Sequence, residues 1–218
     1  MDDRLVEDIV GLPNDLFARN ETSDYGTWED TFLDERAWHR YPTWLQAELD
    51  NYGLIVDLGA NVGYTAYDYY YRCDARIIAV EPDKENYSML VLNLNGCIDI
   101  ETVNKAVSNV SGYGIMTGLA ANAMKLSLDT GDIEVCLLDD IVWREIQANK
   151  PIHFIKFDIE GSEREVINHG GDWVELTRCM KIELHDGYSK DECGAKLDSY
   201  GFIVEEDKTH DQCLLAMK

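Results

Sequence analysis

The chain has 218 residues, of which 45% are apolar and 28% are charged, proportions typical of a globular protein rather than a disordered one. Its 42 acidic residues outnumber 19 basic ones, and the net charge of −23 repels nucleic-acid phosphates, so we expect no nucleic-acid partner. No apolar run reaches the ~18 residues of a membrane span, and the acidic start of the chain does not resemble a secretion signal. We therefore expect a soluble cytoplasmic protein with no membrane partner.

The first 50 residues are rich in aromatic side chains, namely Trp28, Phe32, Trp38, Tyr41 and Trp44. Helical spacing predicts a helix through Phe32, Arg36, Arg40 and Trp44. We expect residues 1–50 to form a helical segment and residues 51–218 to form the main domain. The segment serves either as a lid over a pocket or as a helix that packs its aromatic face on a sheet edge.

The stretch from residue 54 to residue 63 carries the first chemical signal. Leu54–Leu58 is a short apolar run that predicts a buried parallel strand, and the glycine-rich turn after it opens a helix over Tyr64–Arg72. Glycines in this turn let the backbone approach a ligand, although packing alone is an alternative reason for them. We expect a cofactor to contact the turn at Gly59, Ala60, Asn61 and Gly63.

Asp57 indicates which cofactor binds at that turn. A dinucleotide-binding fold leaves room there for a pyrophosphate, whereas Asp57 places a carboxylate in that position. A negative group favours a cationic ligand, and S-adenosylmethionine (SAM), with its ammonium and sulfonium, fits this position better than NAD. We therefore expect Asp57 to belong to a SAM site.

Strands and helices alternate after this turn. We predict a strand over Arg76–Glu81, a helix over residues 83–95 and a third strand over Ile98–Val103. Such units, joined by short turns, predict an α/β fold with a mostly parallel sheet and helices on both faces.

The ends of the second and third strands suit an adenosine. Glu81 ends the second strand, where a carboxylate binds both ribose hydroxyls of an adenosine cofactor. Asn104, Lys105 and Ala106 follow the third strand and place a polar side chain and free backbone at the expected adenine edge. A plain strand exit is the alternative for these three residues.

The second half of the chain completes the sheet. Residues 111–131 are rich in glycine and predict hairpins or a loop over the sheet. A longer helix is predicted over Lys190–Tyr200. About seven strands are expected in all, the later ones over Glu134–Leu138, Ile152–Asp158, Met180–Leu184, Phe202–Glu206 and Cys213–Met217.

Charged residues gather at the ends of two of these strands. Lys156, Asp158 and Glu160 alternate and therefore leave the strand on one face, and Glu183 and His185 repeat the pattern. Charges are costly in a strand buried on both sides unless they are paired or line the crevice where open α/β sheets bind ligands. We expect catalytic roles for Lys156, Asp158, Glu160 and His185. An internally paired cluster that only ends the strands is the alternative.

This cluster can act in two ways. Methyl transfer to an alcohol requires removal of a hydroxyl proton, and His185, expected to be mostly neutral near pH 7, is the better base on intrinsic pKa. We expect Asp158 to lie nearest the methyl group. A further alternative on ligand type is a divalent metal held by Asp158, Glu160, Glu183 and His185.

Together these motifs resemble the FkbM family of SAM-dependent methyltransferases. The matching segments are Val56–Gly63, Ala79–Pro82, Val103–Ser108, Leu138–Ile141, Ile155–Gly161 and Ile182–His185. The Lys-x-Asp-x-Glu-Gly element within them is the most specific. The resemblance implies a class I (Rossmann-like) methyltransferase fold, SAM as methyl donor, and Asp158 beside the methyl group. It also implies SAM contacts from Asp57, Gly59, Asn61, Gly63 and Glu81.

The resemblance further implies O-methylation of a sugar or natural-product hydroxyl, so we expect a small-molecule or glycan acceptor. The tyrosine-rich helix after Gly63 and the glycine-rich segment 112–131 depart from the family pattern and leave the acceptor undetermined. Two other functions stay open, a catalytically silent scaffold with the same fold and a nicotinamide-dependent oxidoreductase. Intact Asp57 and Glu81 disfavour the scaffold, and the acidic turn disfavours the oxidoreductase. The oligomeric state also stays open.

Overall fold

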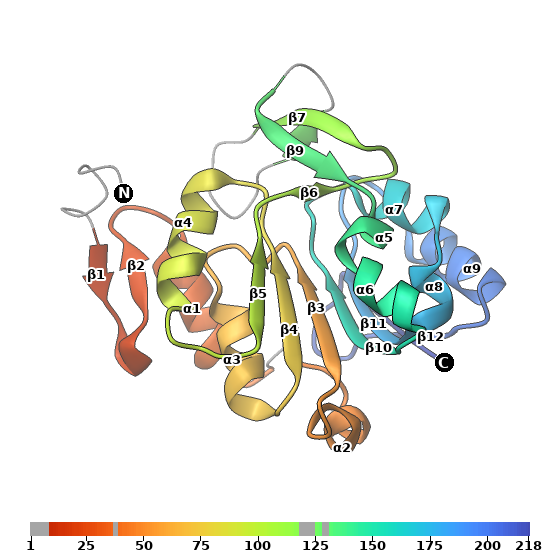
Figure 1. The fold of residues 1–218 in the computed structure, drawn as a ribbon, viewed down its shortest axis with the longest axis horizontal. Helices are drawn as coiled ribbons and strands as arrows, with labels where there is room; N and C mark the ends of the chain where they lie inside the picture. The colour runs from red at the N-terminus through yellow and green to blue at the C-terminus, as the bar shows by residue number, and fades with distance from the viewer. Residues whose placement is uncertain (1–8, 37–38, 118–124, 128–130) are drawn as a thin grey trace.

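Seven strands form the main sheet of the protein, in a computed structural model that describes residues 9–36, 39–117, 125–127 and 131–218 (Figure 1). Their order is β12-β13-β11-β10-β3-β4-β5, in which the five strands from β11 to β5 run parallel and β13 is antiparallel to both its neighbours. The predicted mostly parallel sheet is confirmed. The strand bounds are β3 Leu54–Leu58, β4 Arg76–Val80, β5 Ile100–Val103, β10 Ile152–Phe157, β11 Thr177–Glu183, β12 Ile203–Glu206 and β13 Cys213–Met217.

Two apolar cores lie on the two faces of this sheet, so its central strands are buried on both sides. In β3, Leu54, Val56 and Leu58 pack into one core and Ile55 packs into the other, as the alternation of a pleated strand requires. Helices α1 to α4 contribute to the second core, and α5 to α9 contribute to the first. The helix bounds are α1 Asp24–Phe32, α2 Gln46–Leu49, α3 Tyr64–Arg72, α4 Lys84–Asn93, α5 Leu138–Ile141, α6 Trp143–Ala148, α7 Glu163–His169, α8 Trp173–Leu176 and α9 Lys190–Ser199.

A second sheet of four short strands lies over the carboxyl ends of the main strands (Figure 1). Its order is β6-β9-β7-β8, with bounds β6 Ala106–Val107, β7 Gly112–Thr117, β8 Lys125–Ser127 and β9 Ile133–Cys136. The strand predicted over Glu134–Leu138 therefore pairs with β6 and β7 and does not join the main sheet. The antiparallel pair β7 and β8 confirms a hairpin within residues 111–131, of which 118–124 and 128–130 lie outside the described residues.

The N-terminal segment does not form the predicted helix through Phe32, Arg36, Arg40 and Trp44. Helix α1 ends at Phe32, and the Asp34 carboxylate then accepts hydrogen bonds from the backbone N–H and the guanidinium of Arg36. Such local bonds compete with helix continuation. The Phe32 ring instead meets Tyr64 and Tyr67 of α3 at centroid distances of 6.3 and 6.2 Å. Trp38 lies outside the described residues.

The N-terminal segment contains an antiparallel strand pair that the sequence did not predict, and Arg19 at its end contacts the main domain. The pair joins β1 Ile9–Gly11 to β2 Phe17–Arg19. The buried Arg19 guanidinium donates to Asp24 at 2.8 and 2.9 Å and to Asn86 of α4 at 2.7 Å. Charge-assisted bonds of this kind are stronger than neutral ones, so Arg19 fixes the segment against α4.

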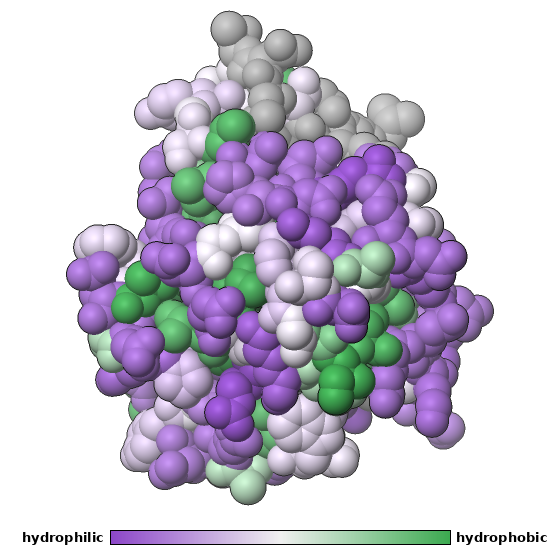
Figure 2. Space-filling view, turned by 90° about the vertical axis from the view of Figure 1, so that its right-hand side faces the viewer, coloured by the Kyte–Doolittle hydropathy of each residue, from purple (hydrophilic) through white to green (hydrophobic). Residues whose placement is uncertain are grey.

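The face of the molecule on the right in Figure 1 is mostly hydrophilic (Figure 2). Figure 2 shows the side of the molecule that lies on the right in Figure 1, where apolar side chains form small groups between polar ones. This pattern agrees with the large excess of acidic residues. In the described part of the chain, every helix is too short or too polar to cross a membrane.

Gly59 allows the turn after β3 to pack on the main chain that follows β10. Its φ is +77°, and an added Cβ would lie 1.7 Å from the carbonyl oxygen of Asp158. We therefore expect Gly59→Ala to lower the free energy of unfolding by about 3 kcal/mol, measured by chemical denaturation. In the control Gly26→Ala on α1, the added Cβ meets no atom within 4 Å, so stability should stay unchanged or rise slightly. Equal stability of the two variants would contradict this account.

Candidate active site

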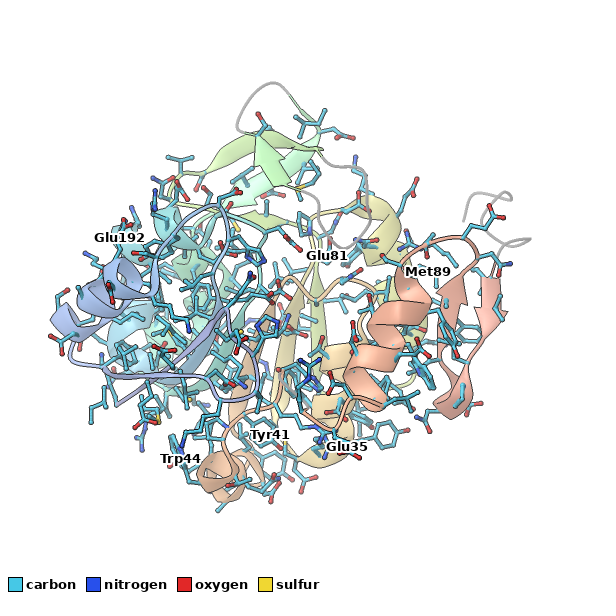
Figure 3. The ribbon with its side chains drawn as sticks, turned by 180° about the vertical axis from the view of Figure 1, so that it is seen from behind. Glu35, Tyr41, Trp44, Glu81, Met89 and Glu192 are labelled. Atoms are coloured by element: carbon cyan, nitrogen blue, oxygen red, sulfur yellow. The ribbon has the colours of Figure 1, made fainter. Side chains whose placement is uncertain are left out.

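A cavity of about 300 Å³ lies at the carboxyl ends of β3, β4 and β10. In Figure 3, Glu81 is labelled there, near the middle of the molecule where the strands end. The predicted site residues on the cavity wall are Gly59, Asn61, Glu81, Lys105, Ala106, Lys156, Asp158 and Glu160. The predicted site residues that the structure describes away from the wall are Asp57, Ala60, Gly63, Asn104 and His185. The fold thus brings residues of separate motifs to one cavity.

The turn after β3 is held by its own hydrogen bonds. The amides of Gly59 and Ala60 both donate to the carbonyl of Val80 at 3.0 Å, so neither amide points at a ligand. Gly63 begins α3 with φ +93°, and an added Cβ would come within 3.3 Å of the Leu90 Cα. Packing therefore requires both glycines. Asn61, with φ +51°, is the residue that brings a polar side chain of the turn to the cavity.

The Glu81 carboxylate is buried at the end of β4 and bonded to the backbone. Its two oxygens accept hydrogen bonds from the amide of Asn61 at 2.8 Å and of Asp83 at 2.9 Å. Burial raises the pKa of Glu81 to about 7, although these amide bonds oppose the rise. Glu81 therefore positions the β3 turn and presents a carboxyl group that titrates near neutral pH.

Of the three predicted residues after β5, one stabilises a neighbouring loop and two line the cavity. The Asn104 side chain donates to the carbonyls of Glu81 at 2.8 Å and Pro82 at 3.0 Å, so it fixes the β4 exit and does not face the cavity. Lys105 and Ala106 line the cavity. The Lys105 ammonium also binds Glu134 of β9 at 2.6 Å, which joins the cavity wall to the small sheet.

Lys156 lies between two aspartates at the ends of β3 and β10. Its Nζ is 2.9 Å from Asp158 Oδ2 and 3.6 Å from Oδ1 of the fully buried Asp57. Burial alone would lower the pKa of Lys156, but the two carboxylates raise it above its ordinary value. Burial raises the pKa of Asp57, and Lys156 opposes that rise. Asp57 thus acts on the cavity through Lys156, and Asp158 reaches it directly.

His185 is not the neutral base that the sequence predicted. Its Nδ1 lies 3.0 Å from Oε1 of the fully buried Glu163, and its Nε2 lies 3.6 Å from Glu160 and 3.8 Å from Glu183. Burial would lower the pKa of His185, but the hydrogen bond to Glu163 and nearby carboxylates raise it to about 9. The imidazole is therefore mostly protonated at pH 7, and the expectation of a neutral His185 is wrong.

Acidic side chains complete this end of the cavity. Glu160 and Glu183 both line it, and burial together with the charge of Asp158 raises the pKa of each to about 7. Glu160 has a left-handed backbone with φ +53°, which is uncommon outside glycine. His210, which the sequence did not single out, also lines the cavity, with its Nε2 3.8 Å from Glu183.

The N-terminal segment supplies cavity residues that sequence reasoning missed. Thr27 and Thr31 lie one turn apart on α1, and their spacing would have identified a polar face had the helix been placed there. The buried His39 also lines the cavity, with its Nε2 2.9 Å from Asp68 of α3. No motif marks His39, because its place depends on packing against α3. Burial lowers its pKa.

A family model described as the methyltransferase FkbM domain matches residues 57–211. This span contains the turn after β3, Glu81 and the charged groups at the ends of β10 and β11. No curated protein matches the sequence.

Several solved methyltransferase structures resemble the fold. A methyltransferase from Geobacter sulfurreducens is 14% identical, covers 89% of this chain and 87% of its own, and has a TM-score of 0.47. A SAM dependent methyltransferase from Aquifex aeolicus is 12% identical over 88% of this chain and 96% of its own, with a TM-score of 0.46. Precorrin-6y C5,15-methyltransferase from Geobacter metallireducens GS-15 is 14% identical over 80% of this chain and 86% of its own, also with a TM-score of 0.46.

The raised pKa of Glu81 makes stability depend on pH. Because the folded pKa of about 7 lies above the ordinary 4.5, the native state binds a proton more tightly than the unfolded chain between these values. The ligand-free protein should therefore lose about 3 kcal/mol of unfolding free energy, relative to Glu81→Gln, as pH rises from about 4.5 to about 7.5. Denaturant titrations at several pH values measure this difference.

The exposed Glu85 offers a matched control for this experiment. Glu85→Gln should follow the wild-type pH dependence. Parallel pH curves for the wild type and Glu81→Gln would contradict a raised pKa at Glu81.

Proposed function

Because the chain belongs to the methyltransferase FkbM family and has the class I methyltransferase fold, we propose that it transfers a methyl group from SAM to a hydroxyl of a small molecule or glycan. The observation that carries the proposal is the Glu81 carboxylate, held by two amides on the cavity wall at the end of β4. A carboxylate at this position of a parallel sheet binds the ribose hydroxyls of an adenosine cofactor. When bound, SAM supplies an electrophilic methyl group.

The cavity residues fit SAM in polarity. The Asn61 Oδ1 atom is buried and accepts no hydrogen bond from the described residues, so it is available to a ligand donor. An unsatisfied buried acceptor costs about 1–3 kcal/mol, which a ligand N–H or O–H would recover. Five carboxyl groups but only two lysine ammonium groups line the described cavity, and this excess of acidic groups favours the ammonium and sulfonium of SAM.

Asp158 is the residue that we assign to the acceptor. It follows β10 on the cavity wall, and Lys156 Nζ donates to its Oδ2 at 2.9 Å. This bond orients the carboxylate, which can then align an acceptor hydroxyl and take its proton. The N-terminal segment contributes α1 and His39 to the cavity wall, and in this proposal it covers the bound substrates and keeps water out of the site.

Calorimetric titration with SAM tests the proposal directly. At pH 8, where the Glu81 carboxyl is ionised, we expect one SAM per chain to bind, and S-adenosylhomocysteine to compete for the same site. Glu81→Gln should weaken binding at least about tenfold, the loss of roughly 1.4 kcal/mol, because a ribose hydroxyl loses a charged acceptor. The exposed control Glu85→Gln should bind as the wild type does. Failure of both compounds to bind at high micromolar concentration would refute the proposed function.

The two aspartates beside Lys156 should affect different steps. Asp57→Ala removes a buried partner of Lys156 and should weaken SAM affinity more than it lowers turnover. Asp158→Asn keeps the shape of the side chain but not its basicity, so turnover should fall by about 10²–10⁴ with little change in SAM affinity.

Turnover is measured as S-adenosylhomocysteine release with a panel of sugar and natural-product alcohols. The exposed Asp74→Asn serves as the control and should change neither quantity. Equal losses of affinity and turnover in both variants would mean that the two roles are wrongly assigned.

A further inference from the structure

Three side chains at the ends of β10 and β11 bring metal-binding atoms together. Each of Asp158, Glu183 and His185 offers one ligand atom, and these atoms lie within 4.8 Å of one another. Ligands at the 2.0–2.4 Å typical of a divalent cation are separated by about 3–4.7 Å, so one ion can reach all three with only small side-chain movements. The cluster joins an imidazole to two carboxylates, which distinguishes it from a surface group of acids alone.

The imidazole of His185 has the orientation of a metal ligand. Its Nδ1 bonds to Oε1 of Glu163 at 3.0 Å, and the Glu163 side chain is fully buried. Histidines that bind metals commonly donate their second ring N–H to a carboxylate in this way, which fixes the ring and presents the other nitrogen. Here the presented nitrogen is Nε2, and it faces Glu160 at 3.6 Å and Glu183 at 3.8 Å. Both distances are longer than an ordinary hydrogen bond, so Nε2 is hydrogen-bonded to neither Glu160 nor Glu183. The proton that Nε2 carries in the ion-free protein is released to solvent when an ion binds.

The loop beside this cluster is held in a strained conformation by the same glutamate. Glu160 adopts a left-handed backbone with φ +53°. The Glu163 carboxylate accepts the amides on either side of it, from Ile159 and Gly161, both at 3.0 Å. Strain of this kind persists where the surrounding structure enforces it and is concentrated at ligand sites. Glu163 therefore fixes the orientation of the His185 ring and holds the loop that carries Glu160 beside this ring.

We propose that Asp158, Glu183 and His185 bind one divalent cation at the wall of the cavity, with Glu160 as an additional oxygen ligand. The mixture of one nitrogen with carboxylate oxygens favours a first-row transition ion such as Mn²⁺ over Mg²⁺, which prefers oxygen ligands alone. Asp158, Glu160 and Glu183 line the cavity, so the remaining coordination positions of the ion face it and are open to water or an acceptor oxygen. This binding goes beyond the proposed function and does not depend on SAM.

Electron paramagnetic resonance with Mn²⁺ as the probe tests the proposal. The full chain is dialysed against a chelator and then titrated with MnCl₂, and free Mn²⁺ is read from its signal. We expect saturation at one Mn²⁺ per chain, with Mg²⁺ at least about tenfold weaker in competition. His185→Gln and Glu183→Gln should each weaken Mn²⁺ binding at least about tenfold. Binding that does not saturate, or Mg²⁺ binding as tight as Mn²⁺, would overturn the site.

Matched substitutions exclude general effects of charge and folding. His169→Gln and Glu206→Gln change exposed residues of the same types and should leave Mn²⁺ binding as in the wild type. A thermal melt of every variant shows whether it is folded, and equal losses in the control and cluster variants would also overturn the site. SAM calorimetry on the same samples separates the two proposals, because Mn²⁺ binding without SAM binding would refute only the methyltransferase activity, and the reverse only the metal site.

Discussion

The contact between the ends of β3 and β10 sets the geometry of the whole site. The two strands pair in parallel with Asp57 opposite Lys156, and the turn after β3 touches the main chain of Asp158 at Gly59, where a side chain does not fit. The Lys156 ammonium consequently lies between two aspartates at the centre of the sheet. Buried charges are tolerated only when they are paired, so these three residues depend on one another. Their arrangement places one carboxylate, that of Asp158, on the cavity wall.

Two other buried carboxylates fix the loops around the cavity. Glu81 holds the turn after β3 through the amide of Asn61, and Glu163 holds the loop after β10 through the amides of Ile159 and Gly161. Backbone amides are favourable partners for a buried carboxylate because they stabilise its charged form without adding a mobile side chain. The polar groups of the cavity are thus positioned before any ligand arrives, which lowers the ordering cost of binding.

The main sheet could be predicted closely from the sequence, because strands buried on both faces leave continuous apolar runs. The first strand was predicted and observed at Leu54–Leu58. The partners of Ile133–Cys136 could not be predicted, since a strand pattern carries no information about its neighbours. Helix α1 was misplaced because the aromatic spacing continued past Asp34, whose side chain bonds to the next turn. The predicted protonation state of His185 was wrong because it rested on the intrinsic pKa of histidine. Glu163, which raises this pKa, is brought beside His185 only by the fold.

A crystal structure grown with S-adenosylhomocysteine tests the central claim most directly, because the claim concerns which carboxylate holds the cofactor. The account predicts that the two ribose hydroxyls lie within hydrogen-bond distance of the Glu81 carboxylate and that the sulfur faces Asp158 across the cavity. A structure in which S-adenosylhomocysteine lies outside this cavity, or in which groups other than Glu81 hold its ribose, would contradict the account.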